Sequence, residues 1–420
     1  MTTIVQARHL LRLALTGISI GALLMTACSL QTPTETQAAA IGTPGSVWIP
    51  AVSVLAVTKT SPPTTATPIP TSSPAPTPTA APVAWARTLT INGAQIAVSV
   101  RGKKSSLPML LVIHGGPGYA MSDLLHARIP ELENDFLVVD YDQRGAGLSY
   151  RSDIDPATMT LAQFVEDADS VRQHVLSQFG LSSATKAYVM GHSMGTMIGL
   201  DLVAKYPTHY AAYIGVGQVV QVAENAQQSY DFALSEAKKA GNTAAITALE
   251  CVGRPSDDWQ FDNPSENLGC DSSADGFEVT NEWMGYFGGD VYGQHGSESV
   301  ENAIFAIPAY QNALTQWNEG IDFSQTLFND PKIPVWDART MHRSAAVPLY
   351  FFMGRHDYDT PAPLAAAYDA VVTSTHQLIW FENSAHFPFF EEPALFRAKL
   401  LEVHNRTTAT AAVRSPKATR

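Results

Sequence analysis

The amino-acid sequence predicts an α/β fold: a mainly parallel sheet flanked by helices, with a mostly helical domain inserted between its two parts. Three observations lead to this prediction. After Ala84, short apolar runs alternate with helical patterns, as in parallel sheets. The alternation stops over residues 219–345 and then resumes. A glycine-containing pentapeptide at residues 191–195 joins a predicted strand to a predicted helix.

Length and composition limit the possible functions. The chain has 420 residues, of which 45% are hydrophobic and 15% charged, enough to bury a sizeable core and add further segments. The 12 histidines and three cysteines show no metal-ligand spacing, so neither a metal nor another cofactor is expected. A net charge of −13 argues against nucleic acid as a partner, because a phosphate backbone requires clustered Lys and Arg.

The first 27 residues are typical of an export signal. Arg8 and Arg12 precede an uncharged run over residues 13–27, which is shorter than the roughly 20 apolar residues of a membrane-spanning helix. The sequence LMTAC at residues 24–28 resembles a bacterial lipoprotein processing site. It predicts lipidation at Cys28 and attachment to the extracellular face of the membrane. Simple secretion and an uncleaved anchor are the alternatives.

The other two cysteines and the low-complexity segments agree with export. Cys251 and Cys270 are a possible disulfide pair in an oxidising compartment, although all three cysteines could also be free thiols. Residues 28–84 are rich in Pro, Thr, Ser and Ala, which predicts an extended, disordered linker. Residues 406–420 are predicted to be a disordered tail.

Eight apolar runs are candidate strands. The core of the sheet is predicted in two parts, residues 85–218 and 346–405, with a cap domain at 219–345 between them. Between the fourth and fifth strands, Thr160 and Gln163 form a capping box before an amphipathic helix that Gly180 ends. The candidate strands are residues 88–91, 97–101, 109–114, 136–141, 187–190, 212–216, 347–353 and 377–381.

The pentapeptide GHSMG at residues 191–195 contains the candidate nucleophile, Ser193. A sharp turn from strand to helix crowds the backbone, so small residues are needed two positions before and after the nucleophile. The turn exposes the serine hydroxyl, and the N-terminus of the following helix favours a developing oxyanion.

A second glycine-rich turn, HGGPG at residues 114–118, directly follows a predicted strand. Such a turn lets backbone N–H groups approach an anionic oxygen. We therefore expect Gly116 and Met194 to form an oxyanion hole, with a plain Gly/Pro turn as the alternative. His114 is expected to be a structural residue of the loop.

The candidate acid is Asp357, which follows the predicted strand 347–353 and precedes Pro361, the start of a predicted helix. Asp359, two residues later, is its rival. Either carboxylate could fix the tautomer of a catalytic imidazole and stabilise its cation.

The candidate base is His386, which lies in the loop after the predicted strand 377–381. The chain order serine, acid, histidine is that of a G-x-S-x-G enzyme. His376 precedes a strand and His404 lies in a terminal helix, so both are poorer candidates. In this interpretation His386 removes the proton that makes Ser193 inert.

Four motifs together resemble the proline iminopeptidase family of the α/β-hydrolases: HGGPG, DQRGAGLS at residues 142–149, the serine pentapeptide and residues 381–393. The resemblance extends over roughly residues 87–403 and implies the α/β-hydrolase fold. It also implies release of an N-terminal residue, typically proline, from a peptide. Asp142 and Arg144 would organise a loop rather than take part in catalysis.

The whole net charge lies in the predicted cap. Residues 219–345 contain 19 Asp and Glu but only 6 Lys and Arg, and the rest of the chain is neutral. The family resemblance implies that cap carboxylates hold the substrate's α-amino group, which requires a paired negative charge when it is desolvated. Glu282 is the first candidate for this anchor and Glu224 the second. An acidic cap that serves only solubility is the alternative.

The sequence thus favours an aminopeptidase that forms an acyl-enzyme on Ser193, with peptides as substrates. His192 and Met194 flank the serine as in many esterases, so a carboxylesterase acting on small esters is the alternative. A binding protein built on an inactive hydrolase scaffold would lack a member of the triad, and none is missing.

Overall fold

The computed structural model describes residues 81–259, 261 and 275–414, with side chains up to residue 409. The predicted export signal, the lipidation site at Cys28 and nearly all of the predicted linker lie outside the described residues. Cys251 near the end of helix α6 is disulfide-bonded; Cys270, its expected partner, also lies outside the described residues.

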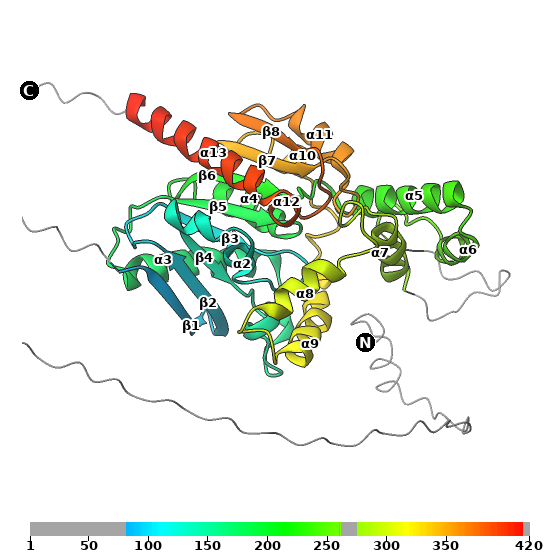
Figure 1. Cartoon of the computed structure of the whole chain (residues 1–420), viewed down its shortest axis with the longest axis horizontal. Helices are drawn as coiled ribbons and strands as arrows, with labels where there is room; N and C mark the ends of the chain where they lie inside the picture. The colour runs from blue at the N-terminus through cyan, green and yellow to red at the C-terminus, as the bar shows by residue number, and fades with distance from the viewer. Residues whose placement is uncertain (1–80, 260, 262–274, 415–420) are drawn as a thin grey trace, which may run out of the picture. The chain divides into compact units, whose positions relative to one another are not determined.

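The core is an eight-stranded sheet with the order β1-β2-β4-β3-β5-β6-β7-β8 (Figure 1). The pairings β1–β2 and β2–β4 are antiparallel and the others are parallel. This mostly parallel sheet confirms the predicted fold class. The strands are β1 (Val83–Ile91), β2 (Ala94–Gly102), β3 (Met109–Ile113), β4 (Leu137–Tyr141), β5 (Ala187–His192), β6 (Tyr210–Val216), β7 (Leu349–Gly354) and β8 (His376–Phe381).

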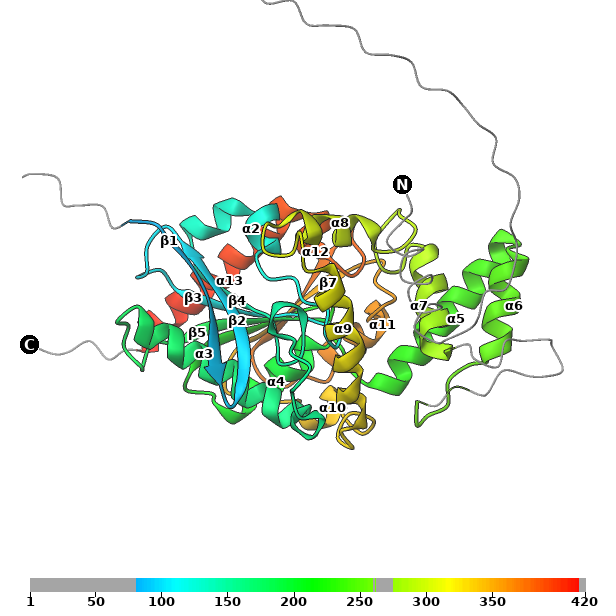
Figure 2. The same ribbon diagram turned by 90° about the horizontal axis from the view of Figure 1, so that it is seen from below.

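Helices cover both faces of the sheet (Figure 2). The apolar side chains of α3, α4 and α11 pack in one buried cluster, and those of α2 and α13 pack in a second cluster on the other face. The α-helices are α2 (Leu124–Arg128), α3 (Leu161–Gln178), α4 (Gly195–Lys205), α5 (Val222–Ala240), α6 (Thr243–Val252), α7 (Gly276–Tyr286), α8 (Glu298–Ala306), α9 (Leu314–Ser324), α10 (Ala338–Met341), α11 (Ala362–Asp369), α12 (Pro388–Glu391) and α13 (Pro393–Arg414). The 3-10 helices are η1 (Pro130–Asn134), η2 (Gly147–Ser149), η3 (Pro156–Thr158) and η5 (Gln325–Asn329).

Two predicted boundaries were wrong. Strand β1 begins at Val83, inside the predicted linker, because it pairs with β2 along its whole length from Val83 opposite Gly102. Helix α13 continues to Arg414, inside the predicted tail. There the hydroxyl of Thr407 bonds to the carbonyl of Val403 at 2.8 Å, one helical turn earlier, so that Thr in this helix keeps its hydroxyl satisfied.

The predicted capping box of α3 is half formed. The hydroxyl of Thr160 accepts the backbone N–H of Gln163 at 3.2 Å, as an N-cap should. The side chain of Gln163 donates forward to Asp167 at 3.0 Å instead of back to Thr160. A buried carboxylate that needs donors outcompetes the reciprocal cap here.

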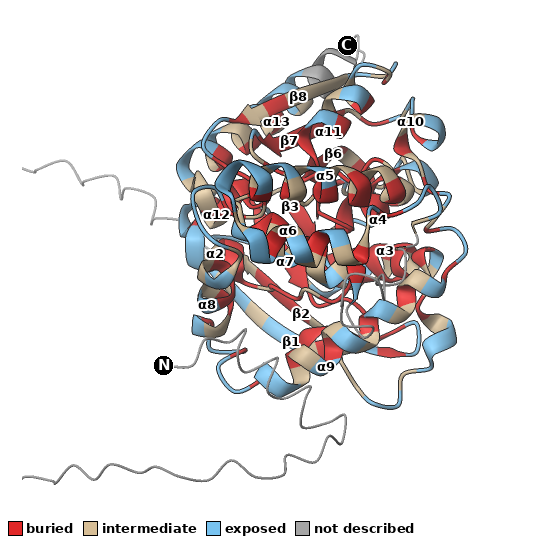
Figure 3. Ribbon diagram, turned by 90° about the vertical axis from the view of Figure 1, so that its right-hand side faces the viewer, coloured by how far each residue is buried: buried red, intermediate tan, exposed pale blue. Residues whose placement is uncertain are grey.

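The inserted segment does not form one uniform cap. Helices α5, α6 and α7 make their own apolar cluster around Tyr230, Leu249 and Met284 and lie together on the side of the molecule that faces the viewer in Figure 3. Helices α8 and α9 instead contribute Ile304 and Trp317 to the main core. Only the first three helices are therefore separate from the core. Within the described chain, no helix has the length and apolarity needed to span a membrane.

Candidate active site

Ser193 occupies a strained turn between β5 and α4. Its φ angle is +54°, in the left-handed region that costs a non-glycine residue about 1–3 kcal/mol. Small neighbours make the turn possible: a Cβ on Gly191 would lie 2.4 Å from the carbonyl oxygen of Gly195, and one on Gly195 would lie 2.4 Å from that of Ile113. The strain holds the Ser193 side chain above the carboxyl end of the sheet, as the pentapeptide predicts.

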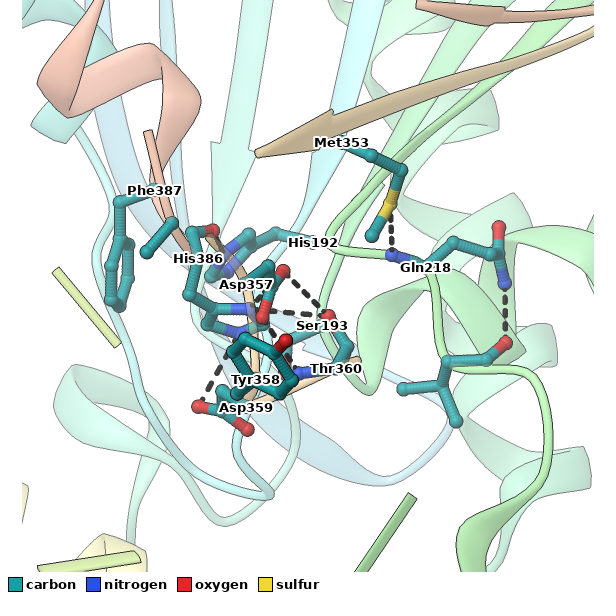
Figure 4. A network of polar contacts seen from close by, with 12 residues as sticks. His192, Ser193, Gln218, Met353, Asp357, Tyr358, Asp359, Thr360, His386 and Phe387 are labelled. Atoms are coloured by element: carbon teal, nitrogen blue, oxygen red, sulfur yellow. Dashed lines mark hydrogen bonds and ion pairs between the residues drawn. The ribbon is translucent and has the colours of Figure 1, made fainter. Parts of the chain in front are cut away.

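Asp357 follows β7 and is completely buried. Its carboxylate accepts the backbone N–H and the hydroxyl of Thr360, both at 2.8 Å. It also accepts Nδ1–H of His386 at 3.0 Å (Figure 4). The structure thus gives Asp357 the position of the acid and His386 the position of the base.

The rival carboxylate, Asp359, contacts the other ring nitrogen. Its Oδ2 lies 3.6 Å from Nε2 of His386, the nitrogen that must face Ser193 in catalysis. No hydrogen bond joins Ser193 to His386 in the described part of the chain. Burial disfavours the imidazolium, but the charges of Asp359 and Asp357 outweigh it and raise the pKa of His386 to about 10.

Two further carboxylates surround His386, and neither was predicted from the sequence as part of the site. Asp290, in the loop after α7, accepts the backbone N–H of His386 with its carbonyl oxygen at 2.9 Å. Burial, and then the charge of Asp359, raise the pKa of the Asp290 carboxyl to about 8. Glu391 on α12 accepts the backbone N–H groups of Ala385 and Phe387, each at 3.0 Å, and so fixes the histidine loop.

His192 contacts both the backbone and the ring of the candidate base, His386. Its Nε2–H donates to the carbonyl oxygen of His386 at 2.9 Å, and the two rings pack with their centroids 4.6 Å apart. Burial, followed by the charge of His386, lowers the pKa of His192 well below its usual value. A neutral His192 is therefore a positioning residue, a role that its place in the pentapeptide did not indicate.

The HGGPG loop is oriented by His114. Its Nε2 accepts the backbone N–H of Gln143 at 2.9 Å, so Nδ1 carries the proton and donates to the carbonyl oxygen of Gly115 at 2.9 Å. Because a trans peptide points its C=O and N–H in opposite directions, this bond turns the N–H of Gly116 away from His114. Burial lowers the pKa of His114 to about 4, which keeps this arrangement neutral and makes His114 the structural residue that was expected.

Gly116 and Met194 meet at one pocket with Ser193. The pocket has a volume of about 590 Å³, its open mouth included, and Gly116, Ser193 and Met194 lie in its wall. A Cβ on Gly115 would lie 2.6 Å from that of Ser193, so the loop approaches the serine as an oxyanion hole requires. The remaining wall is mainly apolar and comes from α4, α5, α7 and η5, including Met197, Val222, Ala226, Phe277 and Phe328.

Neither predicted amine anchor lines this pocket. Glu282 is exposed on α7, and its helix neighbours Thr280 and Asn281 line the pocket without it. Glu224 forms an ion pair with Arg339, Oε1 to Nη2 at 2.5 Å, and its charge is thereby compensated. Among the residues that the structure describes, the carboxylate that lines the pocket is Asp359.

Asp142 and Arg144 organise loops, as the family resemblance implied. The buried carboxylate of Asp142 accepts the hydroxyls of Ser122 and Tyr310 at 2.6 and 2.5 Å. Arg144 makes a two-pronged ion pair with the buried Asp167 at 2.9 and 3.0 Å. No group of His, Cys, Asp and Glu able to hold a metal ion is present among the described residues.

The fold and the arrangement of Ser193, Asp357 and His386 at the carboxyl ends of parallel strands define an α/β-hydrolase. Residues 107–267 match the family model for serine aminopeptidases of the S33 type. The resemblance to proline iminopeptidases is also found among individual proteins, and the chain is an α/β-hydrolase that resembles them.

Two curated relatives align with this chain over almost their whole length. A probable aminopeptidase, YbaC, of Bacillus subtilis is 29% identical over 77% of this chain and 97% of its own. A proline iminopeptidase of Heyndrickxia coagulans is 23% identical over 74% of this chain and 95% of its own. The crystal structure of a proline iminopeptidase from Mycobacterium smegmatis has the same fold, with a TM-score of 0.54 and 18% identity over 78% of this chain and all of that one.

Proposed function

We propose that the protein is a serine aminopeptidase that releases N-terminal proline, or a similar small residue, from peptides. The observation that supports this most is that Ser193 and Gly116 line one pocket together with Asp359 and Thr360. These last two residues contact His386, which is hydrogen-bonded to Asp357. The similarity to a probable aminopeptidase over 97% of that protein's length points to the same reaction.

In the proposed reaction, Ser193 Oγ attacks the carbonyl carbon of the N-terminal residue while His386 takes the hydroxyl proton. The oxyanion accepts hydrogen bonds from the backbone N–H groups of Gly116 and Met194. The C–N bond then breaks, and His386 returns the proton to the leaving amine of the shortened peptide. A water molecule, deprotonated by His386, hydrolyses the acyl-enzyme and frees the amino acid and Ser193.

The pocket wall supports a small apolar residue as the one released. Side chains such as Val222, Ala226 and Phe277 surround the space beside Ser193. A pyrrolidine ring or a short aliphatic side chain gains about 25 cal/mol for each Å² of apolar surface that it buries there.

The test compares an amide substrate with an ester. We expect hydrolysis of prolyl-4-nitroanilide, with kcat/KM well above that for N-acetylprolyl-4-nitroanilide, which has no free amine. Hydrolysis of 4-nitrophenyl acetate without any hydrolysis of prolyl- or alanyl-4-nitroanilide would reject the aminopeptidase and leave the carboxylesterase.

A further inference from the structure

We propose that Asp359, together with Asn225 of α5 and Thr280 of α7, forms the subsite that binds the substrate's α-ammonium group. This inference rests on the proposed aminopeptidase function and identifies the residues that would recognise the free amine. All three residues line the pocket that contains Ser193.

The position of Asp359 suits a charge one carbon away from the reacting carbonyl. Its carboxylate lies 3.6 Å from Nε2 of His386, beside the place where Ser193 is acylated (Figure 4). An α-ammonium is bonded to the carbon next to the acyl carbon, so its counter-ion must stand within a few ångströms of the catalytic histidine. No Lys or Arg pairs with Asp359 in the described part of the chain, and its side chain is 37% exposed.

The loop that carries Asp359 is fixed to α5. The side-chain Nδ2 of Asn225 donates to the carbonyl oxygen of Asp359 at 2.5 Å, and the hydroxyl of Ser229 donates to that of Tyr358 at 2.6 Å. The ring of Tyr358 also stacks on Phe232, with centroids 3.8 Å apart. The backbone that carries the Asp359 carboxylate is thus joined to the inserted helix α5.

Two unpartnered polar atoms lie in the same wall. Because Asn225 uses its Nδ2 on the backbone of Asp359, its Oδ1 is left as an acceptor, and this buried atom has no hydrogen-bond partner in the part of the chain that the structure describes. Thr280 is 2% exposed, and its buried Oγ1 likewise has no partner among those residues. Buried acceptors without donors are costly, and an ammonium group supplies donors. A carboxylate with two neutral acceptors is a suitable set for such a cation.

Binding of an ammonium would also act on His386. The ring lies between Asp357 at Nδ1 and Asp359 at Nε2, while Asp290, Glu391 and His192 lie around it on the other packed elements. A protonated Nε2 held by Asp359 cannot accept the serine proton. A cation that pairs with Asp359 removes one stabilising charge and frees Nε2 for Ser193, so the amine would both anchor and activate the substrate.

The test uses the full chain and its Asp359→Asn variant, with Glu282→Gln as the matched control for a lost carboxylate outside the pocket. KM for prolyl-4-nitroanilide and the inhibition constant of L-prolinol against 4-nitrophenyl acetate hydrolysis are measured for each. We expect Asp359→Asn to raise both by about 30-fold or more, the usual effect of removing one partner of a desolvated charge pair. We expect Glu282→Gln to change neither.

Thr280→Val provides a second, nearly isosteric variant. Because Thr280 Oγ1 has no hydrogen-bond partner among the described residues, its removal should leave the thermal midpoint unchanged or raise it, whereas KM should rise about 3- to 10-fold through loss of its contact with the amine. A purely structural role would not separate these two readouts. Circular dichroism of each variant reports whether it is folded.

Equal inhibition of wild type and Asp359→Asn by L-prolinol would overturn the subsite and leave the aminopeptidase function in place. A larger effect of Glu282→Gln than of Asp359→Asn would also overturn it. Failure of the proposed function would give a different result: the wild-type protein would hydrolyse the ester but no aminoacyl anilide. The proposed subsite would then be rejected together with the function.

Discussion

Oδ2 of Asp357 lies 3.0 Å from Nδ1 of His386, while Asp359 contacts the opposite nitrogen at 3.6 Å. The two aspartates are separated by a single residue in the chain, yet they face different sides of one imidazole. The hydrogen bonds from Thr360 to Asp357 explain the difference, because they hold the first carboxylate in the buried turn and leave the second at the pocket.

This relationship predicts unequal effects of two identical substitutions. Asp357→Asn should lower kcat by about 10⁴-fold, because the amide favours the wrong tautomer of His386. Asp359→Asn should act mainly on KM for substrates with a free amine. Steady-state kinetics on prolyl-4-nitroanilide checks both expectations. A larger loss of kcat in Asp359→Asn than in Asp357→Asn would indicate that Asp359 is the catalytic acid instead.

The pH dependence of ester hydrolysis should report the charges around His386. Its pKa is raised to about 10, and only the neutral ring accepts the serine proton. For 4-nitrophenyl acetate, which carries no amine, kcat/KM should therefore rise with pH from neutrality towards pH 10. Asp359→Asn removes a charge that raises this pKa, so its plateau should begin at lower pH. A profile identical to that of the wild type would show that Asp359 does not influence the base.

His192 should affect catalysis through position alone. His192→Phe keeps a ring against His386 but loses the donor to its carbonyl oxygen, now at 2.9 Å. We expect kcat to fall about 10-fold with KM nearly unchanged, and the free energy of unfolding to fall by about 1 kcal/mol. His192→Gln retains a donor and should recover part of kcat. If kcat does not recover in His192→Gln, and KM rises in His192→Phe by as large a factor as kcat falls, a positioning role is contradicted.

The ion pair between Arg144 and Asp167 should matter for stability. Both side chains are almost completely buried, 3% and 1% exposed, so Arg144→Met leaves an unpaired carboxylate inside the protein. The free energy of unfolding should fall by about 3–5 kcal/mol. The matched control is Lys238→Met, which breaks an exposed pair with Glu250 and should cost less than about 1 kcal/mol. Denaturant unfolding of both variants measures the difference.

Most of the sheet was predictable because the buried strands have continuous apolar runs. All eight predicted strands are present, and the errors are at the ends, as at Val83, where pairing with β2 extends a strand that is largely exposed. The division of the inserted segment was not predictable, because the helices around Met284 and those around Trp317 have similar apolar patterns. Which cluster each helix joins is decided by tertiary packing.

The pentapeptide located Ser193 because its strained turn needs small residues at fixed spacing. Asp357 and His386 were located by their places after predicted strands and by the chain order serine, acid, histidine. These sequence signals could not locate the surroundings of His386. Asp290 is 96 positions before the histidine and reaches it only through the fold. Charge counting indicated an acidic segment but chose Glu282 and Glu224, whereas the carboxylate at the pocket is Asp359, outside that segment. Net charge describes a region, and the geometry of one loop decides which charge faces the substrate.

The central claim, that Ser193 is the nucleophile of an aminopeptidase, is tested most directly by the rate of proline release from a prolyl peptide. The rate is followed by mass spectrometry for the wild type and for Ser193→Ala. We predict release of N-terminal proline by the wild type and a loss of about 10³-fold or more in the variant. A variant that releases proline at a rate near that of the wild type would contradict the account.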